Sequence, residues 1–279
     1  MSSRKETASS ANDASAEAVA TYAAKVREFL RWEVAELHPK AVVTCLERRR
    51  FLTGVVNLRD AAKCAIEEAM ICITLDKDAG KAKASLKTGA DFSTRWFPKY
   101  LEAIRAAKNE GLDLGQEGRL PRAVFKLPLF CCLLLGDWSL VSQWAAWALE
   151  PEVVMTSDMN DDLTLLYVAL VLDDRQRFQS VKLNPKQLDK RVEKPYPAAA
   201  QAIMARDQAA FDRFLEEIEA DFAARARYRG NPSLLHGLGK EDHPLAFDFF
   251  ATSFCSVALK RGMRVTRDSR TIPAALVHR

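Results

Sequence analysis

Asp158, Asn160 and Asp162 place side-chain oxygens at the first, third and fifth positions of a loop, which is how an EF-hand begins. A calcium loop also needs Gly at its sixth position and Glu at its twelfth, where this chain has Leu163 and Ala169. The pattern therefore does not predict calcium.

Two interpretations of this acidic run remain. Its last carboxylates can cap a helix expected over residues 163–172, or the run can form an acidic surface for a basic protein partner. The second interpretation predicts Asp158, Asp161 and Asp162 as partner-binding residues.

Two further groups of residues are of types that carry chemistry. The loop from His236 to His243 holds two histidines and two carboxylates, but its spacing matches no metal-ligand set and it supplies no third partner. Gly111, Gly115 and Gly118 have the spacing of a phosphate loop without the preceding strand or the following Gly-Lys-Ser/Thr. We therefore expect no catalytic residue, no metal and no cofactor, and predict that the protein is not an enzyme.

The cysteines and the basic runs have ordinary structural explanations. The six cysteines lie within or beside apolar helical runs and form no CxxC pair, so they are expected as buried side chains in a reducing cytoplasm. Arg48–Arg50 and Arg225–Arg229 are typical of solvated helix ends, with contact to nucleic acid as the alternative. The net charge of +4, from 41 basic and 37 acidic residues, is too small to favour nucleic acid by itself.

The elements that would position these residues are helices. Between residues 127 and 222 an apolar run, a two-residue polar break and a second apolar run occur three times, with Asp137, Asp174 and Asp207 in the breaks. A period near 34 residues with two helices per unit is typical of stacked helical hairpins. Each of these aspartates is predicted to cap its second helix. The end of the helix expected over 57–75, at Asp76, resembles a degenerate earlier copy of the same unit.

The remaining helices follow from apolar spacing and from breakers. Tyr22, Val26, Phe29, Leu30 and Leu37 mark one face of a helix that His38-Pro39 is predicted to stop. Further helices are expected over 41–52, ending near Gly54, and over 57–75. Asp91 is expected to cap the next helical segment, with Pro98 in the first turn of its main helix. A last helix is expected over 245–261, and Gly262 is predicted to end it.

These elements predict an all-α fold of stacked antiparallel hairpins. Six aromatic residues are expected in its core, namely Trp138, Trp144, Phe211, Phe214, Phe250 and Phe254. We expect a disordered tail over 1–18, an N-terminal helical portion over 19–110 and a helical-repeat portion over 125–279, packed together as one domain. No run of 18 apolar residues occurs, and no apolar segment follows Arg4 and Lys5, so neither a membrane span nor a secretory signal is predicted.

The C-terminal part resembles a known family. Its helix ends in Ala258-Leu259-Lys260-Arg261-Gly262-Met263-Arg264-Val265, followed by Asp268 and by Ile272-Pro273-Ala274-Ala275-Leu276. With the helix centre from Ala205 to Phe211 and the unit Leu135 to Trp138, this looks like the immunity protein family numbered 49 of bacterial polymorphic toxin systems. The likeness covers residues 125–279.

The resemblance implies a cytoplasmic antitoxin that binds one cognate toxin and blocks it, and it carries no catalytic residues over to this chain. Two other classes of function remain open on the sequence. One is a helical-repeat adaptor that assembles partners without blocking an activity. The other is an enzyme or a nucleic-acid binder that grips a phosphate backbone through Arg48–Arg50 and Arg225–Arg229.

Overall fold

The computed structural model describes residues 21, 23–154, 161–183, 196–225, 247–269 and 271–278. These residues are helical apart from turns, loops and two strands of two residues each, β1 (Leu120–Pro121) and β2 (Val153–Val154), which pair in parallel. The predicted all-α fold of packed helices is confirmed.

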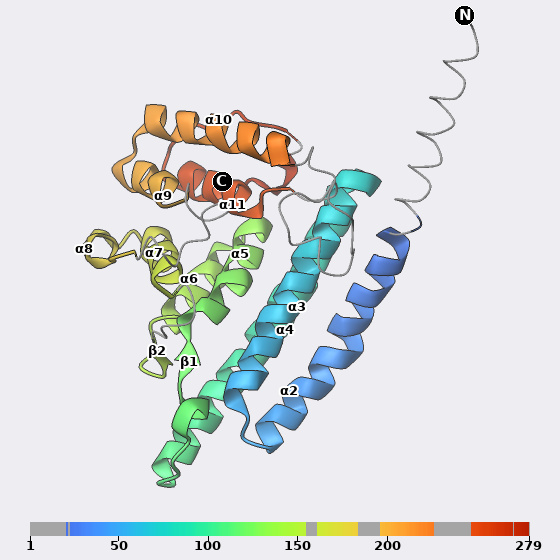
Figure 1. Cartoon of the computed structure of the whole chain (residues 1–279), viewed down its shortest axis with the longest axis vertical. Coiled ribbons are helices and arrows are strands. Elements are labelled where there is room, and N and C mark those ends of the chain that lie inside the picture. Colours follow the sequence, from blue (N-terminus) through green and yellow to red (C-terminus); the bar gives the residue numbers. More distant parts are fainter. Residues whose placement is uncertain are drawn as a thin grey trace, which may run out of the picture.

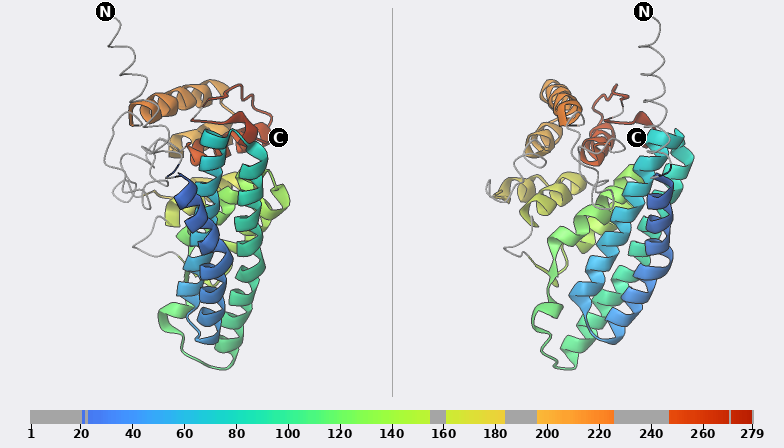
Figure 2. Two further views of the ribbon diagram at one scale, coloured as in Figure 1. Left: turned by 90° about the vertical axis from the view of Figure 1, so that its right-hand side faces the viewer. Right: turned by 45° about the vertical axis from the view of Figure 1, so that its right-hand side comes forward.

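Three long helical rods lie side by side and form one half of the molecule (Figures 1 and 2). The first is helical over 23–32 and runs through a π turn into α2, and the second and third are α3 and α4. Their bounds are η1 (Glu33–Leu37), α2 (His38–Glu47), α3 (Phe51–Ile71) with the π turn η2 (Cys72–Asp76), and α4 (Ala79–Asn109).

Shorter helices form the other half, with α9, α10 and α11 gathered at one end (Figure 1). They are α5 (Lys126–Leu135), α6 (Trp138–Trp147), α7 (Asp161–Leu172), α8 (Arg175–Ser180), α9 (Tyr196–Ala205), α10 (Gln208–Arg225) and α11 (Phe249–Lys260), with 3₁₀ turns η3 (Gly115–Gly118), η4 (Arg122–Phe125) and η5 (Ala274–Leu276). One apolar core runs from α2 to η5 and crosses the predicted boundary near residue 118. Among the described helices, none combines the length and the apolar character that a membrane crossing requires.

The hairpins of the repeat share one type of joint. Asp137, Asp174 and Asp207 each accept a hydrogen bond from the amide three residues later, at 3.0, 2.9 and 3.0 Å. The residue before each Asp is left-handed, with φ of 72°, 56° and 58°, so the first helix stops in the turn in which the second begins. The predicted caps are confirmed, and each contributes about 1 kcal/mol of stability.

A fourth joint of the same kind connects α3 to α4, but its aspartate is not the one that the sequence pattern singled out. The pattern pointed to Asp76 as the degenerate copy, whereas Asp78 accepts the amide of Lys81 at 2.9 Å. Lys77 takes the left-handed position with φ of 55°. Asp76 lies in the preceding π turn and forms an ion pair with Arg27 at 2.9 Å.

The predicted helix stop at His38-Pro39 is wrong. The rod continues through η1, in which the amide of His38 bonds to the carbonyl of Glu33 five residues earlier. Pro39 follows in the first turn of α2, where its missing amide is tolerated. The π turn thus leads directly into the helical turn that holds Pro39, and the rod continues past the proline.

Three other predicted helix limits are wrong for reasons of packing. Gly54 lies inside α3, where it lets Tyr100 of α4 approach closely; a Cβ there would lie 2.1 Å from the Tyr100 hydroxyl. Asp91 and Pro98 lie within α4, which runs unbroken past both. Buried side chains on either side of Pro98, among them Phe97 and Tyr100, hold this stretch against its neighbours.

Five of the six aromatic residues predicted for the core are buried. Trp144, Phe211, Phe214, Phe250 and Phe254 are each at most 6% exposed. The exception is Trp138, which is half-buried at the edge of the core with the Lys260 ammonium 5.3 Å from its ring centroid.

The C-terminal motif holds several helices together. Arg261 is buried, pairs with Asp173 at 3.0 Å, and donates to the Leu170 carbonyl at the end of α7. Gly262, with φ of 79°, ends α11, while Ile272 and Leu276 are fully buried. Helix α11 begins at Phe249, later than predicted, because Asp248 caps it by accepting the Ala251 amide at 2.8 Å.

Candidate functional site

The acidic residues predicted to bind a partner lie at the start of α7. Asp161 and Asp162 are the first two residues of this helix, which therefore starts two residues before the predicted limit, and Asp162 is half-buried. Asp158 lies outside the described residues. Carboxylates in a first helical turn are stabilised by the helix dipole, which suits the capping interpretation; partner binding stays a prediction.

The other candidate groups are only partly described. His236–His243 and residues 226–229 lie outside the described residues, and of Arg225 only its place at the end of α10 is described. Arg48–Arg50 form the exposed turn between α2 and α3, where Arg49 pairs with Glu110 at 3.3 Å.

The outer face of the first rod exposes apolar side chains. Phe29 and Trp32 are 39% and 49% exposed, and their ring centroids lie 5.9 Å apart. We call these two residues the outer pair. Leu37 and Val43 are also exposed further along the rod. Two of these four, Phe29 and Leu37, were predicted on the buried face.

Helix geometry explains this correction. Val26 and Leu30 point inward and are at most 4% exposed. Phe29 is one residue before Leu30 and so is turned about 100° around the axis, away from the core. Leu37 lies in the π turn, whose wider winding rotates it away from the face that an α-helix would give it.

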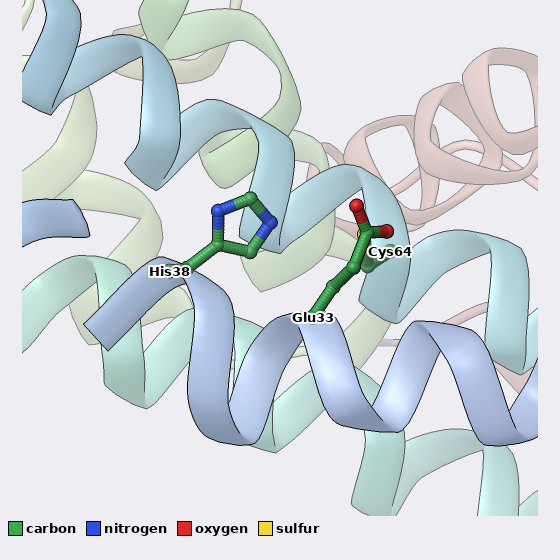
Figure 3. A group of neighbouring side chains, drawn as sticks. All are labelled: Glu33, His38 and Cys64. Carbon is green, nitrogen blue, oxygen red and sulfur yellow. The ribbon is translucent and has the colours of Figure 1, made fainter. Parts of the chain in front are cut away.

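The inner face of the same rod carries a polar cluster of Glu33, His38 and Cys64, which we call the inner triad. Glu33 and His38 bracket the π turn, and Cys64 lies opposite on α3 (Figure 3). One ligand atom of each lies within 4.8 Å of the other two. The Cys64 thiol donates to Oε2 of Glu33 at 3.1 Å.

Asn57 determines which nitrogen of His38 carries the proton. Its Nδ2 donates to the Thr53 carbonyl at 2.8 Å, so its Oδ1 faces Nδ1 of His38 at 3.1 Å. Since an amide oxygen only accepts, Nδ1 is the nitrogen that donates, and in the neutral imidazole Nε2 then presents a lone pair. That Nε2 is buried and has no hydrogen-bond partner, and it faces Glu33 and Cys64 (Figure 3).

The surroundings of the inner triad are partly desolvated. Burial, and then the hydrogen bond with Glu33, hold the pKa of the Cys64 thiol far above its usual range. Burial also raises the pKa of Glu67, one turn further along α3, although Lys63 lies 3.4 Å away. The cluster thus joins a neutral thiol, an imidazole lone pair and a carboxylate.

A hollow lies elsewhere in the fold, away from the inner triad. This hollow of about 390 Å³ between α7, α8 and α9 is lined largely by apolar side chains such as Phe178 and Met204, with Arg175 beside them. Its lining includes Leu183 and Pro197, which flank a stretch outside the described residues, so we assign it no ligand.

Comparisons of the chain with protein family models, with curated proteins and with solved structures each gave no match.

Proposed function

We propose that this chain is an immunity protein that binds a cognate bacterial toxin in the cytoplasm and neutralises it by protein–protein contact, without catalysis of its own. Two observations support the proposal. The C-terminal residues that carry the family resemblance form a joint between α7 and α11 through Arg261. The helical stack also presents a long outer rod at its edge (Figure 1).

The observation that carries the proposal is the outer pair. Two aromatic rings in contact with each other and with solvent, on a helix that has a buried face of its own, are typical of a protein-binding surface. Trp is enriched among the residues that contribute most to protein–protein affinity. Lys25, Glu28, Glu36 and Lys40 are exposed on the same rod and supply the polar rim that such surfaces have.

The proposal predicts that a toxin domain is encoded directly upstream of this chain's gene, and it is tested by measuring the affinity of the purified full-length chain for that domain. We expect a stable complex that inhibits the toxin. A toxin that neither binds the chain nor loses activity in its presence would contradict the proposal.

Replacing both residues of the outer pair, Phe29→Ala with Trp32→Ala, should weaken toxin binding by at least about 30-fold, the effect of losing a single strong contact residue. The free energy of unfolding should fall by only about 1–2 kcal/mol, because each side chain is about half exposed and lies outside the core. Surface plasmon resonance and thermal unfolding measure the two effects.

The matched control is Leu112→Ala, which removes an equally exposed apolar side chain from the loop after α4. It should leave affinity unchanged. If the double variant binds like the parent, the outer pair is not the contact surface.

The second candidate surface is the acidic start of α7. An Asp158/Asp161/Asp162→Asn variant should associate more slowly with a cationic toxin at low salt, since complementary charge mainly speeds encounter. If these aspartates only favour the helix start, substitution will lower stability by about 0.3–1 kcal/mol and leave the association rate constant alone. An unchanged association rate at low salt would end the partner-binding hypothesis for these residues.

A further inference from the structure

We propose that Glu33, His38 and Cys64 form a binding site for a divalent transition-metal ion, zinc above all, that clamps the first rod to α3. The site brings together the three ligand types that zinc takes from proteins: a thiolate, an imidazole and a carboxylate. It is independent of the proposed toxin binding.

The geometry is close to that of a metal site. Ligand atoms around one tetrahedral zinc ion lie about 3.3–3.8 Å apart, given bonds of about 2.0–2.3 Å. The three candidate atoms lie within 4.8 Å of one another, and the Cys64 sulfur is already 3.1 Å from a Glu33 oxygen. Side-chain shifts of about 1 Å would bring the three ligand atoms to the spacing of a tetrahedral zinc site. Glu33 is half-buried, so its side chain has room to move.

The strongest sign of a ligand is the imidazole of His38. Its side chain is 4% exposed, and its Nε2 lone pair points into the triad without a partner. A buried acceptor without a partner is unfavourable, and a bound cation would remove that cost. Asn57, whose Oδ1 accepts a hydrogen bond from Nδ1, is the kind of outer partner that fixes the tautomer of a metal-ligating histidine.

The donor set selects the class of metal. Calcium and magnesium take oxygen ligands, whereas a mixed sulfur, nitrogen and oxygen set suits zinc and its neighbours in the first transition row. Because the Cys64 thiol must lose its proton to bind, each metal ion displaces one proton from sulfur, and affinity should rise about tenfold per pH unit. Three protein ligands leave the fourth position to water.

The consequence of binding would be structural. The stretch of the first rod before the π turn packs on α3 through a small apolar cluster of its own, in which Ala23, Val26 and Leu30 meet Cys64 and Ile71. This cluster is separate from the main core, which the α2 end of the rod joins through Val42 and Cys45, so the stretch before the π turn has limited apolar support. A metal bridge from Glu33 and His38 to Cys64 would fasten the rod at mid-length.

The test is a titration of the purified full-length chain, first stripped with a chelator, with zinc in competition with a chromogenic chelator. We expect one zinc per chain and a higher thermal unfolding midpoint in zinc than in chelator. Cobalt should give a thiolate charge-transfer band. A parent chain that binds no zinc, or cobalt without that band, overturns the proposal.

Variants then assign the ligands. Cys64→Ser and His38→Gln should each weaken zinc binding by more than about 100-fold, while Asn57→Ala, which acts only through His38, should cost about 10–100-fold. The matched control is Cys72→Ser, another buried cysteine two turns further on and outside the triad, which should bind zinc like the parent.

If Cys64→Ser does not fold, the His38→Gln titration and the cobalt spectrum of the parent decide the question. Equal zinc affinity in His38→Gln and in the parent contradicts the site.

Discussion

Replacing Trp144 with alanine should lower the free energy of unfolding by about 3–5 kcal/mol. The ring is 2% exposed and lies 5.5 Å from Phe97, 5.8 Å from Phe125 and 5.1 Å from Trp147, centroid to centroid. Truncation would leave a cavity where α4, η4 and α6 meet and would leave Thr94 without the indole donor that now lies 3.0 Å from its hydroxyl.

Chemical denaturation of the parent and of this variant measures the effect, with Trp138→Ala as the comparison. Trp138 is half-buried at the rim of the same core, so its loss should cost only about 1–2 kcal/mol. Equal effects for the two tryptophans would contradict the packing described here.

Replacing Gly54 with leucine should cost about 2–4 kcal/mol, although leucine is intrinsically better in a helix by close to 1 kcal/mol. Its Cβ alone would lie 2.1 Å from the Tyr100 hydroxyl. Tyr100 would have to move, and its hydroxyl now donates to the Val42 carbonyl at 2.7 Å. One substitution would thus disturb α2, α3 and α4 together.

Gly80→Ala is the matched control, since Gly80 also lies in a helix but its added Cβ would meet only Asp78, at 3.2 Å. This change should be neutral or slightly stabilising. Thermal unfolding of both variants decides the matter, and a Gly54→Leu protein as stable as the parent would show that the helices can separate at this crossing at no cost.

The repeated hairpin joints were predictable from the sequence because their cause is local. An Asp beside a residue that can turn left-handed, between two apolar runs, both ends one helix and caps the next. Asp137, Asp174 and Asp207 follow this rule. At the fourth joint the sequence pointed to Asp76, whereas the capping residue is Asp78, two residues later, because a π turn lengthens the end of α3.

The features that sequence reasoning missed depend on contacts between distant segments. In the sequence Gly54 resembles a helix end, whereas in the fold it is needed inside α3 because Tyr100 of α4 packs against it. Pro39 resembles a stop unless the π turn before it is known, and no local pattern predicts that turn.

The same π turn made the inner triad invisible in the sequence. It separates Glu33 from His38 by five residues on one inward face, and Cys64 joins them from another helix, so no ligand spacing is visible in the sequence. The exposed outer pair was missed because Phe29 was assigned to the buried face beside Leu30. A helical projection of residues 26–32, in which Val26 and Leu30 share a face that excludes Trp32, is the signal that could have found it.

The measurement that tests the proposed function most directly is growth of bacteria that express the toxin domain encoded beside this gene, with and without this chain. We predict that the parent chain restores growth and that the Phe29→Ala/Trp32→Ala variant, produced at the same level, does not, while Leu112→Ala does. Cells that die equally in the presence and absence of the parent chain would contradict the proposal that it is an immunity protein.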